Sequence, residues 1–463
     1  MYKLFVAIVM LFCGMFYSAS QNNNSNVHIS FRDIPEYSAS QINIYLLSNK
    51  MGTQTLIDSV IIKNNNSAGM YIPGNADPGL YSVMIYANVN GRNIKSNLNF
   101  LFDNEDVNFN TCIDYPMDSM HVSGSPVNSY YFDFMQKKKH FMDYYKTILK
   151  LKQMTLPDDT FYGELNKKGN NILEEQRELY KKIRTNHSDD IASEYCRWYL
   201  LSEVYVNEMS NVEQLRKTFL DRFNFSDPLI ENSDLIDRIT STYMFLFKDE
   251  SLTAEQQEQK LIDAIDVMMV YYSVDDEIVK YVATRLIKEF KGLAMENAVI
   301  HIADNYLNSN ACLSDRAEEN LLDEVSRLKH LQAGEKAPDF KIEMNGLHNF
   351  YDIKSDTLIV LFWATWCPHC KNIVPEMYDM LEKHSQTKVV AIALDDEAEA
   401  WDNAIKKYPQ WIHLDAEKMW DDELAVNYAI YATPTIYVLN SDFTIIDKVK
   451  NMDELKLLFN EKN

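Results

Sequence analysis

The chain has 463 residues and a formal net charge of −23, because 68 acidic side chains outnumber 45 basic ones. Such an excess of negative charge argues against binding to nucleic acid or to an anionic membrane surface, and it favours solubility. At this length we expect more than one domain.

The first 20 residues are typical of a signal peptide. Lys3 gives the positively charged start, and the apolar run over residues 4–16 is too short to predict a membrane span. Residues 18–20 are small, as a cleavage site requires, so we expect the mature chain to begin at Gln21.

The cysteines outside the C-terminal region do not suggest a disulfide-stapled scaffold. Cys13 would carry the lipid of a lipoprotein, but the bulky Phe12 before it argues against that alternative. The mature chain would keep Cys112, Cys196 and Cys312 besides a C-terminal pair, which is an odd number. We expect these three to be buried apolar residues, and the sequence leaves their pairing open.

Residues 26–125 are predicted to form a β-rich N-terminal domain. Val27–Phe31 alternates apolar and polar side chains, as does Ile42–Ile44, and turn residues separate such runs. The pattern predicts a small sandwich-like domain that ends at Gly124–Pro126.

Residues 128–332 are predicted to form a helical domain, with apolar side chains at helical spacing in Asp276–Phe290. Lys137–Lys139 is a short basic run, which we interpret as a solvated helix face rather than an anion site. The aromatic segment Tyr195–Tyr199 could line a substrate groove, but helix packing is the simpler interpretation.

The strongest functional signal is a pair of cysteines near the C-terminus. The apolar run Leu358–Trp363 predicts a buried strand, and Cys367 and Cys370 follow it at the start of a predicted helix. Unpaired N–H groups at a helix N-terminus stabilise a thiolate, which is the attacking species in disulfide exchange. We therefore expect an exposed Cys367 to attack a disulfide and a less exposed Cys370 to resolve the mixed disulfide.

Other uses of this spacing fit the sequence less well. A structural zinc site needs four ligands, and no second Cys-x-x-Cys pair is present. Haem attachment needs histidine directly after the second cysteine, where Lys371 stands. A structural disulfide is the third interpretation, but it does not explain why a strand delivers the pair to the start of a helix. We expect no metal and no cofactor.

The C-terminal region resembles thioredoxin-fold proteins of the TlpA/ResA-like branch. Phe362–Lys371 resembles the active-site segment, and Pro375 matches the proline that kinks the following helix. Thr433–Thr435 resembles the cis-proline loop, and Gly334–Phe340 resembles the start of the redoxin branch. The resemblance covers about residues 333–463 and implies an α/β domain there, within an α+β multidomain chain.

Three residues depart from the patterns of related proteins. Peroxiredoxins have a threonine where Ala364 stands, which counts against a peroxidase. Related oxidoreductases carry a proton-shuttling acid at one of two positions, which Leu361 and Ile373 occupy here. The sequence does not show how Cys370 loses its proton.

The residues around Cys367 predict its chemistry. Pro368 and His369 resemble the dipeptide of DsbA-type oxidases, and His369 would stabilise the Cys367 thiolate and raise the reduction potential. The scaffold instead favours a reductase, so the direction stays open. Trp366 would form one wall of the site. A cis Thr433–Pro434 bond would present backbone groups to an extended client.

These features predict an exported thiol-disulfide oxidoreductase of the periplasm, where disulfides persist. Its partners would be client proteins with disulfides or thiols, and an upstream membrane electron donor is possible. We expect no nucleic acid partner and no stable membrane insertion. The alternative is a binding or adaptor protein whose thioredoxin-like domain is accessory.

The remaining elements of the C-terminal domain follow from short local patterns. We expect a hairpin, a kinked helix, a parallel strand, helices around Trp411–Leu414, a second hairpin and a closing helix. The first hairpin is expected over 340–352, the kinked helix over 370–384 and the parallel strand over 388–394. The second hairpin is expected over 435–449 and the closing helix over 452–459.

Overall fold

The structure is a computed structural model that describes residues 25–32, 39–63, 66–89, 91–185, 190–204, 209–307, 316–344, 346–395, 398–449 and 451–459. The predicted signal peptide, its cleavage site and Cys312 lie outside the described residues. The chain divides into two compact units, Met1–Lys248 with Ala264–Ile278 and Asp249–Asp263 with Val279–Asn463.

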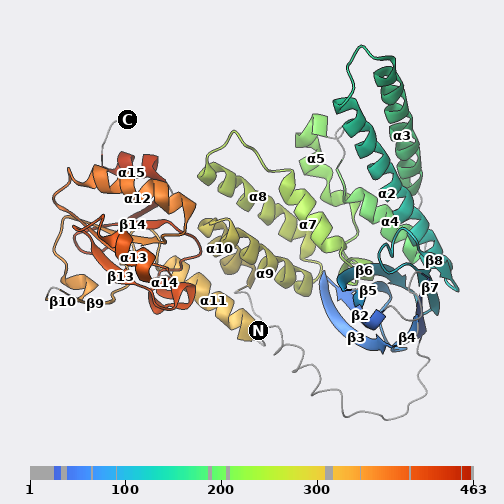
Figure 1. Cartoon of the computed structure of the whole chain (residues 1–463), viewed down its shortest axis with the longest axis horizontal. Helices are drawn as coiled ribbons and strands as arrows, with labels where there is room; N and C mark the ends of the chain where they lie inside the picture. Colours follow the sequence, from blue (N-terminus) through green and yellow to red (C-terminus); the bar gives the residue numbers. More distant parts are fainter. Residues whose placement is uncertain are drawn as a thin grey trace, which may run out of the picture. The chain divides into compact units, whose positions relative to one another are not determined.

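The N-terminal part of the first unit contains two four-stranded sheets (Figure 1). One sheet has the order β3-β2-β5-β6 and is antiparallel; the other has the order β4-β1-β7-β8, in which only β1 and β7 are parallel. The strands are β1 Ser25–Phe31, β2 Ala39–Lys50, β3 Thr53–Ile62, β4 Ser67–Ile72, β5 Gly79–Val89, β6 Arg92–Phe102, β7 Val107–Thr111 and β8 His121–Ser123. In β1 every second side chain is buried, including Val27, Ile29 and Phe31, so the alternation seen in the sequence produces the core face.

Helices follow the strands, as the sequence predicts. Those of the first unit are α2 Pro126–Gln153, α3 Thr160–Thr185, α4 Ile191–Leu201, α5 Val212–Thr218, α6 Pro228–Glu231 and α7 Leu235–Phe245. α8 Ala254–Tyr272 and α9 Asp276–Gly292 cross the division, and α10 Glu296–Ile302 and α11 Arg316–Lys329 belong to the second unit. A π-helix, Ala303–Leu307, directly follows α10. The helices of residues 128–332 are thus shared between the units, and the expected domain boundaries stay predictions.

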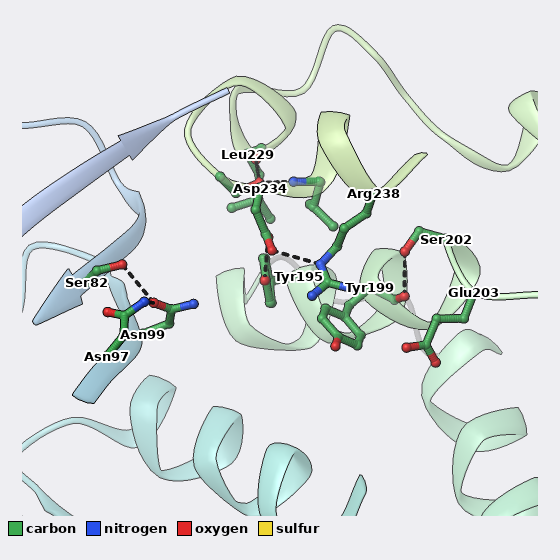
Figure 2. Close-up of polar contacts among 12 residues, drawn as sticks. Ser82, Asn97, Asn99, Tyr195, Tyr199, Ser202, Glu203, Leu229, Asp234 and Arg238 are labelled. Atoms are coloured by element: carbon green, nitrogen blue, oxygen red, sulfur yellow. Dashed lines mark hydrogen bonds and ion pairs between the residues drawn. The ribbon is translucent and has the colours of Figure 1, made fainter. Parts of the chain in front are cut away.

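The aromatic segment of α4 packs in the core of the first unit, which confirms the packing interpretation. Tyr195 is only 1% exposed, and its hydroxyl donates a hydrogen bond of 2.7 Å to the Asp234 carboxylate. Arg238 Nε donates to the other oxygen of Asp234 at 2.8 Å, and its guanidinium lies over the Tyr199 ring, as Figure 2 shows. The partly buried carboxylate is thereby both paired and hydrogen-bonded.

The basic run on α2 forms ion pairs. Lys137 pairs with Asp133, and Lys139 pairs with Asp118 and Asp143, all on exposed surface. Lys138 is less exposed and pairs with Glu203 at 2.6 Å. Each positive charge already has a carboxylate partner, which agrees with a helix face rather than an anion site.

The second unit contains a five-stranded sheet of order β13-β12-β11-β14-β15. β12 runs parallel to β11, β13 runs parallel to β12, and β14 runs antiparallel to β11. The elements of this part are β9 Lys341–Met344, β10 Leu347–Asn349, β11 Thr357–Trp363, α12 Pro368–Leu381, β12 Thr387–Ala393, α13 Ala398–Ile405, β13 Ile412–Asp415, α14 Glu423–Asn427, β14 Thr435–Asn440, β15 Ile445–Val449 and α15 Met452–Leu458. Short 3₁₀ turns are present at Met209–Asn211, Leu220–Arg222, Phe350–Asp352 and Met419–Asp421.

β11 is the central strand, and its residues Leu358–Phe362 are fully buried. Ile359 and Leu361 pack on one face against Val374 and Met377 of α12. Both faces of a strand are covered at the centre of such a layered sheet, which explains its continuous apolar run. The expected fold class, with an α/β domain at the C-terminus, is confirmed.

One local prediction is wrong. Helices were expected around Trp411–Leu414, but Ile412–Asp415 forms β13, which pairs with β12 through Ile412–Val390 and Leu414–Ile392. Four residues are too few for a period to distinguish strand from helix, and the exposed hydrogen-bonding edge of β12 decides the outcome.

Helices of the second unit contact the strands and loop at one edge of the sheet. Lys448 of β15 pairs with Glu296 of α10. Lys291 of α9 pairs with Glu324 of α11, and its ammonium lies 4.5 Å from the centre of the Tyr431 ring. Tyr431 is two residues before Thr433, so these helices contact the loop that carries the cis-proline.

We predict that Asn128→Ala lowers the free energy of unfolding of the first unit by about 2–3 kcal/mol, because two buried backbone groups lose their partners. Asn128 is 2% exposed, and its side-chain amide accepts from Leu101 N at 2.9 Å and donates to Leu101 O at 2.7 Å. Urea unfolding would measure the change. The exposed Asn97, which lies on β6 with Leu101, is the control, and an equal loss in Asn97→Ala would contradict the prediction.

Candidate active site

The two cysteines lie where the central strand gives way to a helix. Cys367 is the N-cap residue of α12, with extended backbone angles, and Pro368 occupies the first turn, where no N–H is needed. Pro375 lies inside the helix, as the resemblance implies. The site is thus built from adjacent residues of β11 and α12, which the sequence already places in order.

The cis-proline loop contacts the first cysteine. The Thr433–Pro434 bond is cis, and the Cys367 Sγ donates a hydrogen bond of 3.2 Å to the Thr433 carbonyl oxygen. Cys367 is only 4% exposed and Cys370 is 1% exposed. The expectation of an exposed Cys367 is therefore wrong, because a loop distant in sequence packs against its sulfur.

The two thiols have different acidities. Burial raises the pKa of Cys367, but hydrogen bonds from the Thr433 side chain and from the backbone N–H groups of Cys370 and His369 outweigh it, so the pKa is lowered from the usual value. Burial also raises the pKa of Cys370, to about 12, and the hydrogen bond and charge of Cys367 raise it further, whereas the Ala364 backbone and the Thr433 side chain lower it only in part. Cys367 therefore forms the thiolate first, and Cys370 stays protonated near neutral pH.

The remaining predicted residues surround this pair in different ways. Trp366 is 47% exposed, and its Nε1 donates to the Leu394 carbonyl at 3.2 Å. Pro368 and His369 are exposed, and the contribution of His369 to the acidity of Cys367 comes from its backbone N–H. An effect of the imidazole itself stays a prediction.

Sequence reasoning missed one positioning residue. Asp395 directly follows the buried residues at the end of β12 and is 8% exposed. Its carboxylate accepts from Thr365 N at 2.9 Å and from Thr365 Oγ1 at 2.6 Å, which fixes the turn before Cys367. An acidic residue at the carboxyl end of a parallel strand was the available signal, since that edge lies beside the end of β11.

The two positions that hold an acid in related proteins are apolar and packed. Leu361 is fully buried, and Ile373 packs against the same core cluster. None of the main influences on the Cys370 pKa is a carboxylate. Neither position can therefore supply the proton acceptor that the resemblance implies for a buried second thiol.

The other cysteines that the structure describes are not linked to the pair. Cys112, Cys196, Cys367 and Cys370 all carry free thiols, and Cys196 is fully buried. Within the described ranges, no group of three or more His, Cys, Asp or Glu side chains could hold a metal ion. No helix in that part of the chain has the length and apolar character needed to cross a membrane.

Comparison with known proteins agrees with this geometry. Residues 355–445 match the model of a thioredoxin-like family. Thiol-disulfide oxidoreductase ResA of Bacillus cereus is 28% identical over 129 residues, which are 27% of this chain and 73% of ResA. Thioredoxin-like protein YneN of Bacillus subtilis is 27% identical over 121 residues, 25% of this chain and 71% of YneN. A solved thioredoxin-like protein from Bacteroides caccae aligns with 56% of this chain and 97% of its own length, at 17% identity and a TM-score of 0.40.

The C-terminal part of the chain is thus a thioredoxin-like domain of the kind found in thiol-disulfide oxidoreductases. The sequence relatives cover about a quarter of the chain. What the β-sandwich and the helices of the first unit do therefore has to be argued from their own residues.

We predict that His369→Ala raises the Cys367 pKa, because a cation or donor beside the sulfur is lost. The pH at which the alkylation rate of Cys367 reaches half of its maximum would then be higher than in the parent protein. The reduced pair would lose stability, so the potential would fall, by roughly 30 mV if the loss is about 1.4 kcal/mol. The backbone donors remain, so the pKa should stay below about 8.5.

Alkylation against pH and equilibration with glutathione measure the two quantities. His384→Ala, beyond the other end of α12, is the control and should change neither. An unchanged pKa and potential in His369→Ala would mean that the imidazole points away from the sulfur.

Proposed function

We propose that this protein is an exported thiol-disulfide oxidoreductase that exchanges disulfides with client proteins through Cys367 and Cys370. The observation that supports it most directly is the split acidity of the two thiols at the start of α12. A thiol that ionises easily beside one that does not is what a nucleophile and a resolving group require.

The reaction proceeds in two exchanges. The Cys367 thiolate attacks one sulfur of a client disulfide, and the client's other sulfur leaves as a thiolate. Cys370 then attacks Cys367 Sγ, the mixed disulfide breaks, and the second client sulfur leaves with the electron pair. Two electrons pass to the client, and Cys367 and Cys370 are joined as a disulfide, which an upstream electron donor must reduce.

The surroundings of Cys367 restrict how a client approaches. The sulfur is mostly covered and contacts the Thr433 carbonyl, so a client disulfide has to lie along the Thr433–Pro434 edge. An extended client segment fits this edge, since backbone groups there can pair as in a strand. The exposed Trp366 offers apolar surface beside it.

The scaffold favours a reductase, and the Pro368-His369 dipeptide favours the alternative, a DsbA-like oxidase. The reduction potential of the Cys367/Cys370 pair decides between them. A value near about −270 mV supports the reductase, and a value near about −120 mV supports the oxidase.

Export to the periplasm rests on the sequence of the first 20 residues. We predict that the mature protein begins at Gln21 and carries no lipid, which mass spectrometry of the protein purified from its native cells would show. A diacylglyceryl group on Cys13 would contradict this and indicate a membrane-anchored lipoprotein.

We predict that Cys370→Ala accumulates mixed disulfides with client proteins, because the first exchange proceeds and the resolving thiol is missing. Non-reducing electrophoresis after acid quenching would detect these adducts, and reductant should release them. Cys112→Ala removes a thiol outside the pair and should trap nothing.

Two outcomes would count against the proposal. Trapping by Cys367→Ala rather than by Cys370→Ala would reverse the roles of the two thiols. Full biological activity of Cys367→Ser would favour the adaptor alternative, in which the thioredoxin-like domain is accessory.

A further inference from the structure

A pocket lies beside the resolving cysteine. Its volume is about 240 Å³, and its walls come from the end of β11, from α12, and from α13 with the residues that follow it. Cys370, Trp363 and Tyr408 contribute to these walls, and Lys371 and Lys407 belong to its lining. One water needs only roughly 15–30 Å³, so the pocket has room for several.

One polar group of the wall is buried without a protein partner, and a second belongs to the lining. Trp363 is 4% exposed, and its Nε1 is a buried donor that has no partner among the residues that the structure describes. Tyr408 is 8% exposed and belongs to the pocket lining. Buried polar groups of this kind are normally satisfied by ordered water.

The reaction requires a proton acceptor for Cys370 at this place. Its thiol must lose a proton before it attacks the mixed disulfide, yet it is 1% exposed and has no carboxylate among its main neighbours. The positions that could have supplied an acid carry Leu361, which lies in the apolar core cluster, and Ile373, which packs against that cluster. The pocket is an opening whose wall includes the Cys370 thiol.

We propose that water in this pocket, held by the Tyr408 hydroxyl, carries the proton of Cys370 to solvent during resolution of the mixed disulfide. The inference rests on the proposed function and names positioning residues for it. The Cys370 sulfur forms its bond to Cys367 Sγ as its proton passes to the pocket water. The client sulfur leaves with the electrons of the broken bond and takes a proton from bulk water.

The charged groups around the pocket fit this direction of proton flow. Lys371 and Lys407 belong to the lining and bring positive charge to the pocket. Tyr408 itself stays protonated, because burial and the nearby Asp379 raise its pKa. Asp395, the carboxylate nearest along the turn, is engaged by Thr365 and is not available as the base.

Reaction of the fully reduced protein with dithiobis(nitrobenzoate) tests the inference. Attack by Cys367 releases one coloured thiol, and resolution by Cys370 releases a second, so stopped-flow absorbance separates the two steps. Tyr408→Phe removes only the hydroxyl, and Ala404→Leu fills the pocket from α13. In both variants we expect the second phase to slow by about fivefold or more and the first to change by less than about twofold.

If Tyr408 had only a structural role, its replacement would not shift the pH dependence of the second phase. We expect the midpoint of the second phase to shift to higher pH in Tyr408→Phe. Tyr378→Phe is the matched control, because the Tyr378 ring lies 5.2 Å from the Tyr408 ring and outside the pocket wall. It should leave both phases and their pH midpoints unchanged.

The outcomes separate this inference from the proposed function. An unchanged second phase in Tyr408→Phe overturns the pocket as a proton path, whatever the folding of Ala404→Leu. Equal slowing in Tyr378→Phe overturns it as well. Absence of the first phase in the parent protein would instead contradict the proposed function itself.

Discussion

The burial of β11 is the constraint on which the redox site depends. Its residues Leu358–Phe362 are fully enclosed between β12 and β14 and under α12, so the strand has one position in the sheet. The chain must then leave the sheet at a fixed point and begin α12 at Cys367. The sulfur atom owes its location to an apolar strand, and its acidity to the helix that the strand delivers.

The same arrangement separates the roles of two chemically identical side chains. Cys367 is in reach of backbone donors and of the Thr433 loop, whereas Cys370 is one turn further on and faces the core. Burial destabilises a thiolate more than a thiol, so burial raises the pKa of the Cys370 thiol. A resolving thiol that ionised as readily as the first would compete for clients, and depth prevents this at the cost of needing a route for its proton.

The sequence shows this site well because its parts are contiguous. The apolar strand, Cys367 and Pro368 follow one another along the chain, and local rules for helix starts and buried strands suffice. Asp395 and the Thr433 contact with Cys367 depend instead on which strands are neighbours, which no local pattern contains. The prediction for Ile412–Asp415 failed for a related reason. These four residues form a strand because they pair with the edge of β12, and not because of their own conformational preference.

The contacts of Lys291 and Lys448 connect the thioredoxin-like domain to helices that precede residue 333 in the chain. Because α9 contacts Tyr431, and Tyr431 stands two residues before Thr433, the helical segment is physically continuous with the surface where we propose that a client binds. If a client binds there, substitutions in α9–α11 can alter which clients are accepted while the cysteine motif stays the same. Chains with identical motifs would then differ in specificity, and the motif alone would be a poor guide to the client.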